Sequence, residues 1–185
     1  TIEYDGRELV GWQRQKNGPS VQQHIEEAIF AFCGEETRIQ GAGRTDAGVH
    51  ALGQVASFEL NSVRKPQVVM NALNQHLKPA PIAILECEEV DKEFNARFDA
   101  TKRHYLYRII NRRAPLTVDA GLAWQVKREL DSDAMARAAT VLVGRHDFTS
   151  FRAAACQANS PIRNLDKLEV TRQGEEIRIR ASALS

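Results

Sequence analysis

The chain has 185 residues, 43% hydrophobic and 26% charged, which is typical of a folded globular protein and excludes a disordered one. Its 25 Lys and Arg nearly balance 24 Asp and Glu, so the net charge of +1 excludes a protein that is strongly basic throughout. No apolar run approaches the ~20 residues of a membrane span, and no signal-peptide pattern opens the sequence, which favours the cytoplasm and no membrane partner.

The first half of the sequence alternates short predicted strands with helices. Residues 1–4, TIEY, have strand character and lead into the turn DGRE. Ser20 followed by Gln23 forms a capping box for a helix that ends at Gly34. Further strands are expected in residues 37–43, 53–60 and 81–90, and a second helix in residues 65–77, where Pro66 lies in the first turn.

The segment GQVASFEL, residues 53–60, alternates two sets of side chains. Since side chains of a strand point to opposite faces in turn, this pattern predicts one half-buried strand. The two sets are Val55, Ser57 and Glu59 on one side, and Ala56, Phe58 and Leu60 on the other.

The second half of the sequence predicts a similar series. A strand is expected in residues 98–111, followed by a helix over 131–144 with Asp131 or Ser132 as its N-cap and Gly144 as its C-cap. The strands at 164–172 and 175–183 are joined by the turn QGE. The order strand, helix, strand, strand, helix, strand in the first half resembles a ferredoxin-like unit, so we expect an α+β fold with antiparallel sheets and helices on the outer face.

A glycine-rich stretch, GAGRTDAGVHALGQ at residues 41–54, carries the most specific chemistry. It lacks the GKS or GKT of a P-loop and the GxGxxG spacing of dinucleotide folds. Arg44 and Asp46 are two residues apart, so on an extended segment their side chains point to the same side. A neighbouring guanidinium keeps a carboxylate ionised and oriented, which suits a metal ligand, a general base or a nucleophile.

Metal chemistry has little support in the sequence. The three cysteines, Cys33, Cys87 and Cys156, form no CxxC pair, which predicts neither a disulfide framework nor a zinc site. A Mg²⁺-dependent phosphoryl-transfer enzyme would need a second carboxylate near Asp46, for which Asp5 is the only nearby candidate. A lone carboxylate acting as nucleophile or base is the better hypothesis.

Basic residues concentrate between positions 97 and 113, where six Lys or Arg accompany the single acid Asp99. A local basic strip on a nearly neutral protein is compatible with a phosphate backbone as partner, and equally with a solvated strand face. The six are Arg97, Lys102, Arg103, Arg108, Arg112 and Arg113.

Six segments together resemble the tRNA pseudouridine synthase A family, in order and at similar spacing over essentially the whole chain. They are EYDGRELVGWQRQ, SVQQHIEEAI, GAGRTDAGVHALGQVASF, EFNARFDATKRHYLYRIIN, GRHDFTSFRA and SPIRNLDKLEV. The resemblance implies two RRM-like units, 1–96 with the catalytic loop and 97–185, whose sheets join into one continuous sheet. It also implies a further helix and strand after residue 185, so the second unit is expected to be incomplete.

The resemblance implies an isomerase that converts uridine to pseudouridine at positions 38, 39 and 40 (tRNA numbering) of the anticodon stem-loop, as a homodimer and without a cofactor. Asp46 takes the position of the family's catalytic Asp, and whether it attacks C1′ or deprotonates C2′ is left open. Arg44 would orient Asp46 and the flipped base, and Tyr105 would pack on that base. The other expected substrate-binding residues are Arg14, Lys16, Thr45, His50 and Arg103.

A non-catalytic RNA-binding module of the same fold is the alternative. The intact Arg44, Asp46 and Tyr105 argue against it, because a member that had lost its chemistry would be expected to change first at the carboxylate.

Overall fold

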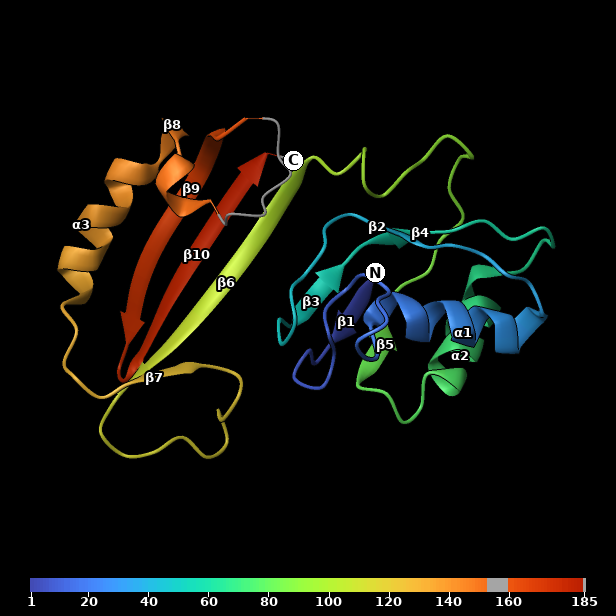
Figure 1. Ribbon diagram of the computed structural model, residues 1–185, viewed down its shortest axis with the longest axis horizontal. Coiled ribbons are helices and arrows are strands. Elements are labelled where there is room, and N and C mark those ends of the chain that lie inside the picture. Colours follow the sequence, from blue (N-terminus) through green and yellow to red (C-terminus); the bar gives the residue numbers. More distant parts are fainter. Residues whose placement is uncertain (153–159, 185) are drawn as a thin grey trace. The chain divides into compact units, whose positions relative to one another are not determined.

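The computed structural model describes residues 1–152 and 160–184. The chain divides into two compact units, Thr1–Ala100 and Thr101–Ser185, and each unit is described by itself (Figure 1). Within the described residues, no helix is long and apolar enough to cross a membrane.

The first unit is built around β1 (Ile2–Tyr4), the central strand of an antiparallel sheet with the order β3-β1-β5. Ile2 and Tyr4 are buried while Glu3 between them is exposed, as expected for a strand with one face on the core. The neighbouring strands are β3 (Ala51–Gln54) and β5 (Ile82–Ile84), and a separate two-stranded sheet joins β2 (Gln40–Gly41) to β4 (Ala56–Ser57).

Two helices of the first unit pack against each other, α1 (Val21–Cys33) and α2 (Pro66–His76). The predicted cap of α1 is confirmed, because Ser20 Oγ accepts the Gln23 N–H over 3.2 Å and Gly34 ends the helix at φ 73°. Buried side chains of both helices join those of β1 and β5 in one hydrophobic core: Ile2, Tyr4, Val21, Ile25, Ile29, Val69, Leu73, Ile82 and Ile84.

The single strand predicted over residues 53–60 is wrong, because β3 ends at Gln54 and β4 begins at Ala56. The two short strands separate because β3 pairs with β1 whereas β4 pairs with β2. The predicted alternation survives the break, since Ala56, Phe58 and Leu60 all pack against the core. The strand predicted over 81–90 is shorter than expected and covers only β5.

The second unit is a five-stranded sheet with the order β7-β6-β10-β9-β8. Its three long strands are antiparallel neighbours, as Figure 1 shows. They are β6 (Lys102–Asn111), β9 (Ile162–Gln173) and β10 (Glu176–Leu184), with β10 in the middle. The short strands at the edges, β7 (Trp124–Val126) and β8 (Gly144–Asp147), were not predicted, and β7 runs parallel to β6.

Helix α3 (Ser132–Leu142) packs against β9. Its N-cap is Asp131, whose carboxylate accepts the N–H groups of Asp133 and Ala134 at 3.0 and 2.8 Å. The predicted C-cap at Gly144 is wrong, because the helix ends at Leu142 and Gly144 starts β8 with φ 106°. A short 3-10 helix, η1 (Thr149–Phe151), follows β8.

The α+β class is confirmed by both units, and their sheets are antiparallel except where β7 pairs with β6. The joining of their sheets into one continuous sheet stays a prediction.

Candidate active site

The loop between β2 and β3 presents Asp46 at the start of a tight turn. The Val49 N–H donates to the Asp46 carbonyl over 3.2 Å, and Gly48 adopts φ 78°, a left-handed conformation that favours glycine. Both Arg44 and Asp46 are exposed to solvent. The turn therefore holds the backbone of Asp46 while its side chain stays accessible.

The preceding segment, residues 4–12, clamps this loop on both sides of Asp46 through the main chain. On one side the Trp12 N–H donates to the Thr45 carbonyl over 3.0 Å. On the other side the Gly48 N–H donates to the Leu9 carbonyl over 3.3 Å. Because the bonds flank Asp46, its backbone position is fixed by contacts that involve no charged side chain.

Two glycines let the clamp approach the loop this closely. A Cβ at Gly11, which has φ 105°, would lie 2.5 Å from the Thr45 carbonyl oxygen. A Cβ at Gly6 would lie 2.1 Å from the Val49 carbonyl oxygen. Any larger residue at either position would push the loop that carries Asp46 away.

A buried aromatic pair, Tyr4 and Trp12, packs against the loop that carries Asp46. The Tyr4 hydroxyl lies 2.8 Å from Thr45 Oγ1, and its ring centroid is 6.3 Å from that of Trp12. Burial raises the pKa of Tyr4 above its usual value, and the hydrogen bond to Thr45 partly offsets this. A Cβ at Gly41 would strike the Trp12 ring at 2.5 Å, so the start of the loop lies directly on the indole.

His50 ties the far end of the loop to the turn at residues 5–7. Its Nδ1 lies 3.3 Å from the Gly6 nitrogen and 3.1 Å from Asp5 Oδ1. An unprotonated Nδ1 accepts the Gly6 N–H, and a protonated one donates to the carboxylate, so both states tether the ring. Hydrogen bonding from Arg7 holds the pKa of Asp5 below its usual value.

The expected pairing of Arg44 with Asp46 is not formed in the structure. Over residues 1–152 and 160–184, neither side chain makes a hydrogen bond or an ion pair. The carboxylate is therefore unneutralised, and an orienting role for Arg44 stays a prediction. Among these same residues, no three His, Cys, Asp or Glu gather as a metal site would require, and Asp5 is engaged by Arg7 and His50.

Arg14 and Lys16 lie just after the clamp and are exposed. Arg14 faces α1, where its guanidinium pairs with Glu26 at 3.1 Å and Glu27 at 3.6 Å. Lys16 lies in the turn closed by a bridge between Gln15 and Gly18.

Tyr105 and Arg103 belong to the second unit, on β6. Tyr105 is 58% exposed, and its cross-strand partner is Ala181, as that of Arg103 is Ala183. Because alternate residues of a strand share a face, Arg103, Tyr105 and Tyr107 lie on the same side of the sheet. The residues across from Arg103 and Tyr105 on β10 are small alanines, and the Tyr105 ring is exposed.

The sequence analysis did not single out Tyr4 or Gly11 as parts of the site. The available signal was the glycine beside an aromatic in LVGW, which is typical of a close backbone approach. What it approaches is a residue more than thirty positions away, and no local pattern contains that information.

Fold and site together define an α+β protein that presents an exposed carboxylate, Asp46, without a partner among the described residues, on a loop fixed by its backbone. A family model described as tRNA pseudouridine synthase matches residues 1–99 and 138–184. The chain belongs to this family, whose members are isomerases that act on tRNA.

Proteins named tRNA pseudouridine synthase A are similar to the chain over its whole length. The one from Parvibaculum lavamentivorans is 57% identical over 185 residues, which are 100% of this chain and 75% of that protein. The one from Beijerinckia indica is 60% identical over 100% of this chain and 71% of that protein. The one from Sinorhizobium fredii is 58% identical over 100% of this chain and 76% of that protein.

Proposed function

We propose that this chain isomerises uridine to pseudouridine at positions 38, 39 and 40 of the tRNA anticodon stem-loop, with Asp46 as the nucleophile. The observation that carries the proposal is the exposed Asp46 carboxylate, unpaired among the described residues, on a loop held by main-chain bonds on both sides. The family membership supplies the reaction class and the tRNA substrate.

The reaction needs only a carboxylate that can attack and leave. Once the target base has left its stack, an Asp46 oxygen attacks C1′ and the N1–C1′ bond breaks, with its electron pair passing to the uracil. The detached uracil turns, and C5 attacks C1′ while the ester bond to Asp46 breaks. Loss of the C5 proton and uptake of a proton from solvent at N1 then restore the aromatic ring, and the carboxylate is regenerated, so no oxidant, reductant or cofactor is consumed.

The clamp contributes by fixing the attacking oxygen before the substrate arrives. A reacting group held in the right geometry can supply roughly 7–11 kcal/mol of the barrier reduction. We therefore assign Thr45 and His50 to positioning of the loop, since Tyr4 and Asp5 already engage their side chains. Arg44 is the group within the same loop that can pair with the carboxylate or hold the base out.

Tyr105 is the proposed stacking partner of the flipped uracil. Its ring is more than half exposed, and stacking of a base on an aromatic side chain is worth roughly 1–3 kcal/mol. Arg103, Arg14 and Lys16 would contact the phosphate backbone, which positions the RNA without reading its sequence.

We also propose that the protein acts as a homodimer in the cytoplasm. The family resemblance supports the dimer, and the tRNA substrate supports the compartment.

Mapping of the product tests the proposal. A tRNA transcript with uridines at 38, 39 and 40 is incubated with the protein, and a carbodiimide adduct then marks each pseudouridine as a primer-extension stop. We expect stops at these positions with the wild type and with Asp91→Asn, a matched exposed carboxylate in the same unit. Asp46→Asn should give no stops. Stops elsewhere would refute the site, and tRNA binding without stops in the wild type would favour the non-catalytic RNA-binding module.

A kinetic isotope effect separates the two roles open to Asp46. If the carboxylate attacks C1′, the C2′–H bond stays intact throughout the reaction. Deuterium at C2′ then changes the rate little. A large primary isotope effect at C2′ would overturn the nucleophile and establish Asp46 as a base.

A further inference from the structure

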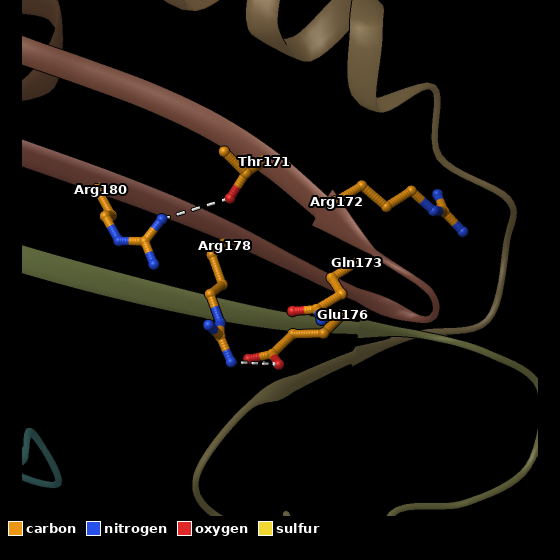
Figure 2. Close-up of a pocket in the computed structure, with 6 residues that line it drawn as sticks. All are labelled: Thr171, Arg172, Gln173, Glu176, Arg178 and Arg180. Atoms are coloured by element: carbon orange, nitrogen blue, oxygen red, sulfur yellow. Dashed lines mark hydrogen bonds and ion pairs between the residues drawn. The ribbon is translucent and has the colours of Figure 1, made fainter.

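An open pocket of about 340 Å³ lies at the hairpin end of β9 and β10, and none of its lining residues has been assigned a role above. Its lining is polar and carries three guanidinium groups against one carboxylate (Figure 2). The lining residues are Thr171, Arg172, Gln173, Glu176, Arg178 and Arg180.

Strand register places the important side chains on one face of the sheet. Arg178 lies on β10, the middle strand, opposite Thr171 of β9 on one side and Arg108 of β6 on the other. Arg180 follows two residues later, so its side chain lies on the same face, ~7 Å further along the strand at about 3.4 Å per residue. Such a separation is similar to that of neighbouring phosphates along an RNA strand.

Arg172 does not belong to this face. Its guanidinium donates to the carbonyls of Gly174 and Leu130 at 3.0 Å each, and it points away from Arg178 and Arg180 (Figure 2). Arg172 therefore fastens the hairpin to the segment before α3 and is not a ligand group.

Glu176 does not neutralise the pocket, because its carboxylate is shared between Arg108 and Arg178. Its two oxygens accept from Arg108 Nε at 2.6 Å and from Arg178 Nη2 at 2.9 Å. The hydrogen bonds from Arg178 and Arg108 lower the pKa of Glu176 to about 2, so the carboxylate is ionised across the physiological range. Arg108 has a second carboxylate partner, Asp119, at 3.0 Å, whereas among the described residues Arg178 has Glu176 alone and shares it with Arg108.

Most donors of the two outward arginines remain unused. In the described part of the chain, Arg178 bonds only Glu176, and its buried Nε has no acceptor. Arg180 reaches Thr171 Oγ1 only at 3.4 Å and Glu169 only at 3.8 Å, and Glu169 lies closer to Lys167 at 3.0 Å. Unpaired guanidinium N–H groups in a partly enclosed site favour an anion that presents several oxygens.

We propose that Arg178 and Arg180 form a subsite for the phosphodiester backbone of the bound tRNA. This inference rests on the proposed function for the identity of the RNA. The guanidinium fork matches phosphate oxygens, and Thr171 adds a hydroxyl donor beside it. The lining offers no aromatic or apolar group on which a base could stack, so the contact strengthens binding independently of sequence.

Salt dependence of tRNA binding tests the subsite. Each lost phosphate contact lowers the slope of log K against log salt by about 0.7–0.9. Arg180→Gln keeps most of the length of the side chain and removes its charge, so the slope should fall by that amount. The slope is measured by filter binding over about 50 to 200 mM NaCl. Arg180→Lys should keep the slope. Arg137→Gln, which removes an exposed charge from α3 in the same unit, is the matched control and should leave it unchanged.

Arg178→Gln provides a second variant, since Arg108 still pairs with Glu176 in it. Arg178→Gln should lower the slope as Arg180→Gln does, because each variant loses one phosphate contact. A slope in Arg180→Gln equal to that in Arg137→Gln would overturn the subsite. If the slope falls but the wild type releases no hydrogen from C5 of uridine, the subsite stands and the proposed function fails, so the two failures are distinguishable.

Discussion

Gly11→Ala changes the clamp, residues 4–12, at the point where it contacts the loop that carries Asp46. Gly11 has φ 105°, and the new Cβ would lie 2.5 Å from the Thr45 carbonyl oxygen, which accepts the Trp12 N–H. Thr45 immediately precedes Asp46, so a displacement of its carbonyl moves the proposed nucleophile. Neither Gly11 nor Thr45 is required to touch the substrate.

Two costs add at this position. An alanine in the left-handed region costs roughly 1–2 kcal/mol. The Thr45 carbonyl must also withdraw by about 0.9 Å to restore an ordinary contact of 3.4 Å. A misplacement of about 1 Å in an active site can cost ~10²-fold in rate. We therefore expect a modest loss of stability and a loss of about two orders of magnitude in the single-turnover rate.

Gly34→Ala is the matched control. Gly34 also lies in the left-handed region, at φ 73°, but a Cβ there meets nothing within 4 Å. It shares the backbone strain of Gly11→Ala without the contact. The assay is pseudouridine formation under single-turnover conditions, with thermal unfolding followed by circular dichroism. If the two variants lose activity equally after correction for the folded fraction, the clamp does not position Asp46 and the reasoning fails.

Two further predictions follow from the two units. Tyr4→Phe keeps the buried ring and removes the hydroxyl that lies 2.8 Å from Thr45 Oγ1, so the free energy of unfolding should fall by about 0.5–1.5 kcal/mol. The single-turnover rate should fall while tRNA affinity is unchanged, and an unaltered rate would show that this bond does not hold the loop. Glu176, whose pKa is lowered to about 2 from 4.5, stabilises the folded state above pH 4.5 and loses that contribution as the pH falls toward 2. Glu176→Gln should therefore be less stable than the wild type at neutral pH, with a difference that shrinks toward pH 2 in urea titrations. A difference independent of pH would contradict the ion-pair account.

The features predicted correctly from sequence are those whose causes are local. The cap of α1 depends on Ser20 and Gln23, and that of α3 on Asp131, all within a few residues of the helix they start. The C-cap predicted at Gly144 failed because its positive φ serves the start of β8 instead. A glycine signals a special backbone conformation but not which element uses it.

The features missed from sequence depend on pairing between distant segments. β7 has three residues and gains its identity only by lying parallel to β6. The alternation in residues 53–60 shows which side chains face the core, but the break between β3 and β4 arises because the two strands pair with different partners. The alternation of apolar and polar residues indicates which side chains are buried. It does not indicate which strand will pair with which, because that depends on the folded chain.

The candidate site divides in the same way. Asp46, Arg44 and Tyr105 can be singled out from motifs because their residue types carry the chemistry. The clamp cannot, because its main-chain bonds link Trp12 to Thr45 and Leu9 to Gly48, and the backbone groups of any residue could make them. Only the glycines that permit the close approach leave a trace in the sequence.

Release of hydrogen from C5 of uridine tests the central claim most directly. A tRNA transcript carrying tritium at C5 is mixed with excess protein, and the tritium that enters water is followed with time. Formation of the C5–C1′ bond must expel this hydrogen, whereas binding or strand cleavage leaves it in place. We predict complete release at the target uridines by the wild type and by Asp91→Asn, and none by Asp46→Asn with tRNA binding retained. Release by Asp46→Asn at the wild-type rate would contradict the assignment of Asp46 as the nucleophile.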